Sequence, residues 1–382
     1  MQWFHRSVLQ LEKFAVKRAI ARVIDTETYY AQSGNPAVSA FERALSLRLN
    51  NFSVVGLNSG TDALVSALRV IGIGHGDEVI VPAFSFISTA SAVGLVGATP
   101  VFVDVREEDF AIDSSKIEEK ITTKTKAVIV AHLFGQPALR MADILPLAQQ
   151  HGLFVIEDAA HAFGSTLKIN GEEKPIGTIG DFGCFSFSSS KILSAPGNGG
   201  ALVMKNSAFT EDVKRMRAYG AKRHYFDYPL LGGNSYMHEI QAAALIAKLD
   251  FFDHWLSHRK KNAAAYSSQL SRIAGIILQN EYPESMRTWY RYVIRVKERD
   301  ALFERLMLRA RSNWHLMPSI NYPIALPYFS VFQHLGHVHG NFPIAEKLSS
   351  EVLSLPITNY VSPDDASGVA QEIEKFFGKD NE

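Results

Sequence analysis

The chain has 382 residues, with 39 basic and 39 acidic side chains and a formal net charge of zero. A chain of this length can bury a large core and predicts two domains, while its balanced charge excludes a global field that would attract nucleic acid or an anionic membrane. With one cysteine, Cys184, and no run approaching the roughly 18 apolar residues of a membrane helix, we expect a cytoplasmic protein without disulfides.

The first 35 residues are predicted to form a helical segment that packs on the body of the protein. Residues 7–24 place apolar side chains at helical spacing and put lysine and arginine on the opposite face. A helix lying on a membrane surface is the alternative, and it is disfavoured because Glu12 and Asp25 dilute the basic face.

Residues 36–245 alternate short apolar strands with helices. This pattern predicts a large α/β domain with a mainly parallel sheet covered by helices on both faces. The predicted strands are 53–57, 78–82, 99–104, 126–132, 153–158, 182–187 and 200–204, and the predicted helices are 62–71, 89–96 and 141–151.

Residues 246–382 are predicted to form a smaller α+β domain. A long helix over 241–261 leads into it, and strand material follows at 290–296. Further helices are expected over 300–311, 342–353 and 363–377.

Three segments carry candidate chemistry at strand ends. Ser59, Gly60 and Thr61 open a helix and can present backbone N–H groups to an anion, although an ordinary helix cap has the same composition. Asp158 ends the most apolar strand and is either a helix cap or the partner of a buried cation or protonated ring nitrogen. His161 is either a core histidine or a ligand contact.

Lys191 is the only charged residue between Asp181 and Lys205. An amine in apolar surroundings shifts toward its neutral, nucleophilic form, whereas a surface lysine in a strand-to-helix turn is the simpler explanation for this segment alone. No dinucleotide, P-loop or nucleophile-elbow motif competes with this chemistry. His334, His337 and His339 have no cysteine or carboxylate cluster nearby, and we predict no metal site.

Together, the anion cradle, the carboxylate and the lysine are the parts needed to hold pyridoxal phosphate. The sequence motifs that contain these residues resemble those of the DegT/DnrJ/EryC1/StrS family of sugar aminotransferases, which have the fold-type-I architecture. The resemblance extends from about residue 30 to residue 377. It rests on Asn58-Ser-Gly-Thr-Asp-Ala-Leu64, Val81-Pro-Ala-Phe-Ser-Phe-Ile-Ser-Thr-Ala90, Gly97-Ala-Thr-Pro-Val-Phe-Val-Asp104, Ala131-His-Leu-Phe-Gly-Gln-Pro137, Ile156-Glu-Asp-Ala-Ala-His161 and Cys184-Phe-Ser-Phe-Ser-Ser-Ser-Lys191.

This resemblance implies a role for each matching residue. Lys191 would bind the cofactor as a Schiff base and then move the proton, and Asp158 would pair with the pyridinium nitrogen. Ser186 would bind the phosphate with Ser59, Gly60 and Thr61. Phe86 would lie against the cofactor ring, and His161 would contact the cofactor near its ring hydroxyl. Asn234 would reach the phosphate of a neighbouring subunit, which implies a homodimer with shared active sites.

The implied activity is amination of a keto group on a dTDP-, UDP- or GDP-linked deoxysugar, with L-glutamate as amino donor, in polysaccharide, O-antigen or secondary-metabolite biosynthesis. Lys191 argues against the family branch that performs 3-dehydration, which has histidine there. The alternatives are a non-catalytic regulatory or binding protein with the same fold and an aminotransferase for a non-sugar ketone. Three substrate-side positions depart from the common pattern, namely Tyr236, Asn198 and Leu326, and the last lies in a segment without the usual histidine.

Overall fold

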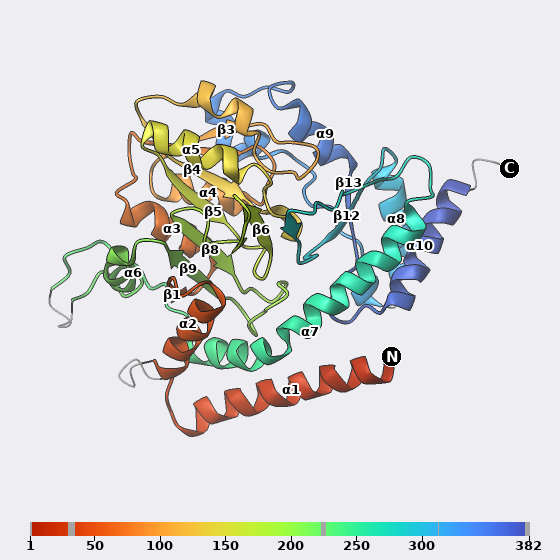
Figure 1. Cartoon of the computed structure of the whole chain (residues 1–382), viewed down its shortest axis with the longest axis horizontal. Coiled ribbons are helices and arrows are strands. Elements are labelled where there is room, and N and C mark those ends of the chain that lie inside the picture. The colour runs from red at the N-terminus through yellow and green to blue at the C-terminus, as the bar shows by residue number, and fades with distance from the viewer. Residues whose placement is uncertain (1, 30–34, 223–226, 312, 379–382) are drawn as a thin grey trace.

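The computed structural model describes residues 2–29, 35–222, 227–311 and 313–378. Within these residues the centre is a seven-stranded sheet in the order β1-β9-β8-β5-β4-β2-β3 (Figure 1). Only β9 runs antiparallel to its neighbours, which confirms the predicted, mainly parallel sheet. The strands are β1 (Ser53–Leu57), β2 (Glu78–Pro82), β3 (Thr99–Val103), β4 (Thr125–Ala131), β5 (Phe154–Asp158), β8 (Phe182–Ser186) and β9 (Gly200–Met204).

Helices cover both faces of this sheet, as the doubly apolar strands predict. Alternate residues of a strand point to opposite faces, and accordingly Ile80 packs in one core cluster while Val79 and Val81 pack in another. The first cluster includes side chains of α2 (Pro36–Arg48), α5 (Met141–His151) and α7 (Glu239–Leu270). The second includes side chains of α3 (Gly60–Val70), α4 (Ile87–Leu95), α6 (Thr210–Met216) and α9 (Pro343–Glu351).

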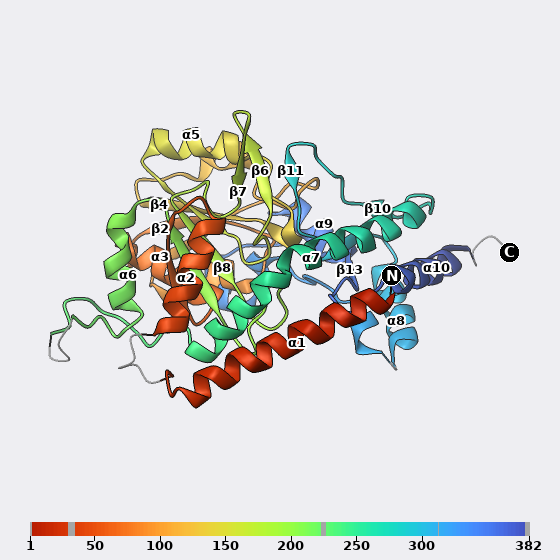
Figure 2. The same ribbon diagram turned by 60° about the horizontal axis from the view of Figure 1, so that its bottom comes forward.

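The N-terminal helix α1 (Gln2–Asp25) lies along α7 (Figure 2). The Trp255 indole N–H donates a hydrogen bond to the Glu12 carboxylate between the two helices. Burial raises the pKa of Glu12, and the Lys248 ammonium and the indole N–H oppose that shift. Among the residues described, α1 and the other helices all fall short of the length and apolarity that crossing a membrane requires.

The C-terminal part has its own core around a small antiparallel sheet. Strands β10 (Ile277–Leu278), β12 (Tyr292–Arg295) and β13 (Val352–Leu355) form the sheet, and α8 (Arg299–Ala310) and α10 (Pro363–Gly378) pack with it. Helix α7 extends to Leu270, beyond the predicted 261, because Ala263, Tyr266 and Leu270 continue its apolar face into this core. The proposed boundary near residue 245 therefore falls inside one continuous helix and stays a prediction.

Two local predictions differ from the structure. The helix predicted over 342–353 is wrong at its end, because Val352 and Leu353 pair with β12 as the first residues of β13. The hairpin of β6 (Thr166–Ile169) and β7 (Glu172–Pro175) was not predicted, and β11 (Ser285–Met286) pairs with β6. Its exposed strand β7 reads Glu-Glu-Lys-Pro, so it offers no apolar alternation to detect.

Short 3₁₀ turns complete the elements. They lie at Ser114–Lys116, Glu118–Lys120, Leu133–Gly135, Ser207–Phe209, Trp314–Leu316, Leu326–Tyr328 and Ser330–Leu335. The turn over Leu133–Gly135 follows β4 directly and borders the cavity that forms at the carboxyl ends of the parallel strands.

Candidate active site

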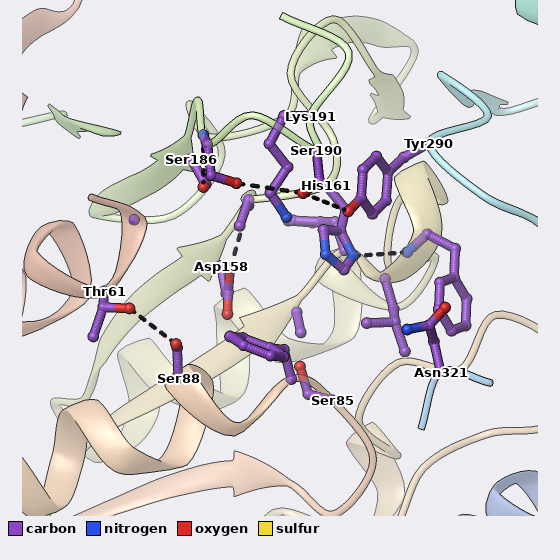
Figure 3. A pocket seen from close by; sticks show the side chains of 18 of the residues that line it. Thr61, Ser85, Ser88, Asp158, His161, Ser186, Ser190, Lys191, Tyr290 and Asn321 are labelled. Carbon is purple, nitrogen blue, oxygen red and sulfur yellow. Dashed lines mark hydrogen bonds between the residues drawn. The ribbon is translucent and has the colours of Figure 1, made fainter. Parts of the chain in front are cut away.

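A cavity of about 390 Å³ lies at the carboxyl ends of the parallel strands, where open α/β sheets bind ligands (Figure 3). Eight of the nine predicted site residues line it, namely Ser59, Gly60, Thr61, Phe86, Asp158, His161, Ser186 and Lys191. Figure 3 shows Thr61 and Ser88 on one side, Lys191, His161 and Tyr290 on the other, and Asp158 between them.

Lys191 lies in the loop that follows β8, held by a hydrogen bond from its backbone N–H to the Ser188 carbonyl (2.9 Å). Its Nζ is 4.6 Å from the centroid of the Tyr290 ring. Burial lowers the pKa of Lys191, the Arg291 cation lowers it further, and Tyr290 and Asp158 oppose the shift. Burial thus stabilises the neutral form of the Lys191 amine relative to that of an exposed lysine.

Asp158 is the last residue of β5 and is 9% exposed. Its Oδ2 accepts a hydrogen bond from Thr89 Oγ1 (2.7 Å), and its Oδ1 accepts one from the Ala160 N–H (3.3 Å). These two hydrogen bonds fix the orientation of the carboxyl group at the cavity wall. The carboxylate is therefore placed to pair with a protonated ring nitrogen.

His161 is held as a neutral imidazole. Its Nδ1 accepts a hydrogen bond from the Phe134 N–H (3.3 Å), which leaves the ring proton on Nε2. Burial lowers the pKa of His161 well below its usual value, and the Lys191 and Arg291 cations lower it further. The ring stacks on Tyr290 with centroids 4.2 Å apart, so His161 presents a flat face at the cavity wall.

The N-terminus of α3 lies at the place of the predicted anion cradle. Ser59 caps the helix by accepting the Asp62 N–H (3.0 Å), and among the described residues no acceptor pairs with the N–H groups of Gly60 and Thr61. Ser186, at the end of β8, approaches so closely that a Cβ on Gly60 would lie 2.8 Å from the Ser186 Cβ. The cradle fits a phosphate, because its donors are first-turn N–H groups and hydroxyls.

Substitution Gly60→Ala is expected to weaken cofactor binding by about 10- to 100-fold, because overpacking of this kind costs on the order of 1–3 kcal/mol. Titration of the apo-protein with pyridoxal phosphate measures the effect. Gly94→Ala in α4 is the matched control, since a Cβ there meets no atom within 4 Å. Equal cofactor affinities for the two variants would contradict the assignment of the cradle.

Two predicted residues occupy different environments. Phe86 precedes α4, lines the cavity and remains 49% exposed, with its ring 5.9 Å from that of Tyr322. Asn234 does not line this cavity. It lies in the segment before α7 and pairs with Ala218 in an isolated bridge. Its predicted contact with a neighbouring subunit stays a prediction.

The three residues that depart from the family pattern lie in different environments. Asn198 lines the cavity, whereas Leu326 is fully buried in the core cluster that contains α9. The ring of Tyr236 faces Arg217, whose Cζ lies 5.5 Å from the ring centroid. Only the departure at Asn198 therefore changes the lining of the cavity in this chain.

Among the cavity residues that were not predicted as site residues are Tyr290, Arg291, Asn321 and Tyr322. They come from the C-terminal part, which docks on the turn after β4. The Arg291 N–H donates to the Phe134 carbonyl (3.3 Å), and the Thr288 N–H donates to that of Gly135 (3.2 Å). The sequence placed Tyr290 and Arg291 only at the start of the predicted strand 290–296, and Tyr322 only in the segment without the usual histidine.

Tyr290 is expected to titrate at unusually low pH in the apo-protein. Burial of the phenol raises its pKa, but the Lys191 and Arg291 cations and the hydrogen bonds from Ser190 and Arg291 outweigh this and lower the pKa to about 8. The phenol is neutral below that pH and charged above it, so tyrosinate absorbance should appear as the pH rises through about 8.

Ultraviolet titration of Tyr290→Phe should lack this step. Tyr292→Phe is the matched control, because burial raises the pKa of Tyr292 to about 12 and its removal should leave the low step intact. Persistence of the step in Tyr290→Phe would show that another phenol is responsible.

Comparisons with known proteins agree with this geometry. The profile of the DegT/DnrJ/EryC1/StrS aminotransferase family matches residues 13–374. A UDP-N-acetyl-3-dehydro-alpha-D-glucosamine 3-aminotransferase of Acidithiobacillus ferrooxidans is 38% identical, over 93% of this chain and 92% of its own. A protein of Geobacillus stearothermophilus named pleiotropic regulatory protein is 37% identical, over 85% of this chain and 84% of its own.

Solved structures share the whole fold. DesV of S. venezuelae, in complex with a ketimine intermediate, superposes with a TM-score of 0.88 at 33% identity and covers 97% of this chain and 96% of its own. NtdA of Bacillus subtilis, with bound cofactor PMP, has a TM-score of 0.84 at 27% identity and covers 95% of this chain and 82% of its own. In this chain, the residues at the N-terminus of α3, Asp158 and Lys191 fit a pyridoxal phosphate group. The chain belongs to the DegT/DnrJ/EryC1/StrS aminotransferase family and is a pyridoxal-phosphate-dependent aminotransferase.

Proposed function

We propose that this enzyme transfers an amino group from L-glutamate to a keto group of a nucleotide-linked deoxysugar. The observation that carries the proposal is Lys191, a half-buried amine that shares one cavity with the Asp158 carboxylate and the cradle at α3. The names of relatives support the substrate class, since the A. ferrooxidans protein is described as acting on a UDP-linked keto sugar. A surface polysaccharide or a secondary metabolite would be the destination of such a product.

Each cavity residue has a proposed role that follows from its position. When bound, pyridoxal phosphate supplies an electron-accepting ring that stabilises negative charge at the substrate carbon. Lys191 would hold the cofactor covalently and then move a proton at its Nζ, for which its lowered pKa is suited. Asp158 would keep the ring nitrogen charged, neutral His161 would offer its Nε2 proton to an oxygen, and Phe86 would lie against the ring.

Binding of the phosphate falls to the cradle. Ser59, Gly60 and Thr61 provide the helix N-terminus, and Ser186 adds a hydroxyl from the neighbouring strand end. The Thr61 and Ser88 hydroxyls share a hydrogen bond of 2.9 Å on the same wall, which leaves one of the two O–H groups free to donate into the cavity.

We also propose that two copies of the chain share their active sites. Asn234 belongs to a segment that carries the exposed side chains of Tyr228 and Leu231, so it is accessible to a second copy. Sedimentation of the holoenzyme should then give the mass of a homodimer, and Asn234→Ala should weaken cofactor binding although Asn234 lies outside its own cavity. The balanced charge and the single buried cysteine favour the cytoplasm as its compartment.

The substrate class is tested in the second half-reaction. The enzyme is loaded with the amine form of the cofactor, and its return to the lysine-bound form is followed by visible absorbance after a ketone is added. We expect a fast return with one dTDP-, UDP- or GDP-linked keto deoxysugar and a slow one with simple 2-keto acids and with cyclic ketones that lack the nucleotide.

The alternatives predict different outcomes of the same experiment. A fast return with a ketone that lacks the nucleotide, and none with any nucleotide sugar, would replace the proposal with an aminotransferase for a non-sugar ketone. No spectral change with any amino acid or ketone would favour a binding protein that retains the cofactor.

A further inference from the structure

Arg291 contributes a cation to the cavity wall. None of the roles proposed above, in binding the cofactor or in moving a proton, involves this residue. Among the described residues that line the cavity, Lys191 is the only lysine and Arg291 the only arginine. Asp158 is the only carboxylate among them. No ion pair joins Arg291 to a carboxylate in the described ranges of the chain. Since Asp158 is engaged at Thr89 and placed for the cofactor ring, Arg291 is left for another anion.

Below the pKa of Tyr290, which is about 8, the guanidinium is held by uncharged hydroxyl groups. Its Nη1 donates to Ser319 Oγ (3.1 Å), which in turn donates to Asn321 Oδ1 (2.9 Å). Its Cζ lies 5.2 Å from the centroid of the Tyr290 ring, and the Tyr290 hydroxyl is its other partner. A guanidinium has five N–H donors in a rigid fork that matches an oxyanion, so these contacts orient the group without neutralising it.

The position of this charge relates it to the reacting amine. Arg291 and Lys191 both lie against the Tyr290 ring, with Cζ at 5.2 Å and Nζ at 4.6 Å from its centroid. The charge of Arg291 lowers the pKa values of Lys191 and His161, although burial has the larger effect on both. An anion bound at Arg291 therefore lies beside the place where the amino group is transferred.

We propose that Arg291 binds a carboxylate of the amino-acid donor. This inference rests on the function proposed above and names a recognition site for its first substrate. The α-carboxylate is attached to the same carbon as the transferred amine, so its binding group must lie close to Lys191. The phosphates of a nucleotide sugar are separated from the keto carbon by the sugar ring, and their binding groups belong farther out.

The first test is equilibrium binding to the holoenzyme. Glutarate is the probe for a carboxylate, because it lacks the amine and cannot react, and UDP, dTDP and GDP are the probes for the phosphates. Calorimetry with Arg291→Gln should show a loss of glutarate affinity of about 10- to 100-fold, as expected for one or two charge-assisted hydrogen bonds. Nucleotide affinity should stay within about twofold.

The second test separates the two half-reactions of the same variants. The concentration of glutamate that half-saturates the conversion of the cofactor should rise about 10- to 100-fold in Arg291→Gln, whereas that of the keto sugar in the reverse conversion should not change. Arg291→Lys keeps the positive charge but loses the two-pronged guanidinium geometry. Its half-saturating concentration of glutamate should therefore lie between those of the wild type and Arg291→Gln. Arg140→Gln is the matched control, because Arg140 is half exposed and outside the cavity.

The outcomes are distinguishable. Unchanged glutarate and glutamate constants in Arg291→Gln would overturn the inference, and so would a loss confined to the nucleotides. Should Arg291→Gln fail to fold, as judged by circular dichroism, Arg291→Lys carries the same comparison. If the wild type binds glutarate through Arg291 but transfers no amine to any ketone, the proposed function fails while the anion site stands.

Discussion

Substitution Lys191→Ala is expected to abolish turnover while the protein keeps its fold. The variant removes both the covalent anchor and the group that moves the proton, and general acid–base catalysis alone contributes about 10²- to 10⁴-fold. We therefore expect a loss on the order of 10⁴-fold or more in steady-state transamination, together with loss of the visible absorbance of the lysine-bound cofactor. The free energy of unfolding of the apo-protein should change by less than about 1 kcal/mol, because the side chain borders an open cavity.

The control for this variant is Lys205→Ala, which removes an exposed lysine at the end of β9. It should match the wild type in turnover and absorbance. Transamination retained by Lys191→Ala at more than a small fraction of the wild-type rate would refute the role of Lys191, whatever its spectrum.

Substitution Asp158→Asn is expected to lower kcat by roughly 10²- to 10³-fold, the usual effect of removing one preorganised electrostatic group. The amide can still accept the Thr89 hydroxyl, so the geometry survives while the charge that keeps the ring nitrogen protonated is lost. The cofactor should remain attached to Lys191, and the visible band should persist. Stopped-flow measurement of the glutamate half-reaction would place the loss in the chemical step.

Asp104→Asn is the matched control for the carboxylate. Asp104 also follows a strand of the same sheet and is buried, but it accepts the backbone N–H groups of Ile344 and Ala345 at the start of α9. Its variant should lower the free energy of unfolding and leave kcat nearly unchanged. If Asp104→Asn and Asp158→Asn had equal effects on kcat, the role assigned to Asp158 would be wrong.

The part of the site on the large sheet was predictable from sequence. Parallel strands bring their carboxyl ends to one edge, so Ser59 and Asp158 could be assigned to one place without knowledge of the strand order, and the family resemblance added Ser186. The two-face burial of the strands likewise followed from their unbroken apolar runs. The residue pattern left open whether Asp158 is a helix cap or the partner of a cation, and only the family resemblance favoured its pairing with the cofactor.

The wall contributed by the C-terminal part was not predictable in the same way. Tyr290 and Arg291 reach the cavity because the segment before β12 docks on the turn after β4, more than a hundred residues earlier in the chain. Likewise, the Leu326 N–H donates to the Ala83 carbonyl (2.8 Å) and brings Asn321 and Tyr322 to the cavity. No local periodicity encodes such docking, so the residues that we associate with donor binding became visible only in three dimensions.

Reduction of the holoenzyme with borohydride, followed by peptide mass spectrometry, tests the central claim most directly. Reduction makes the bond between the cofactor and its lysine permanent, so the modified residue can be identified without any substrate. We expect one modified peptide per chain, with the added mass on Lys191 and on no other lysine. A modification at a different lysine, or none after full reconstitution with pyridoxal phosphate, would contradict it.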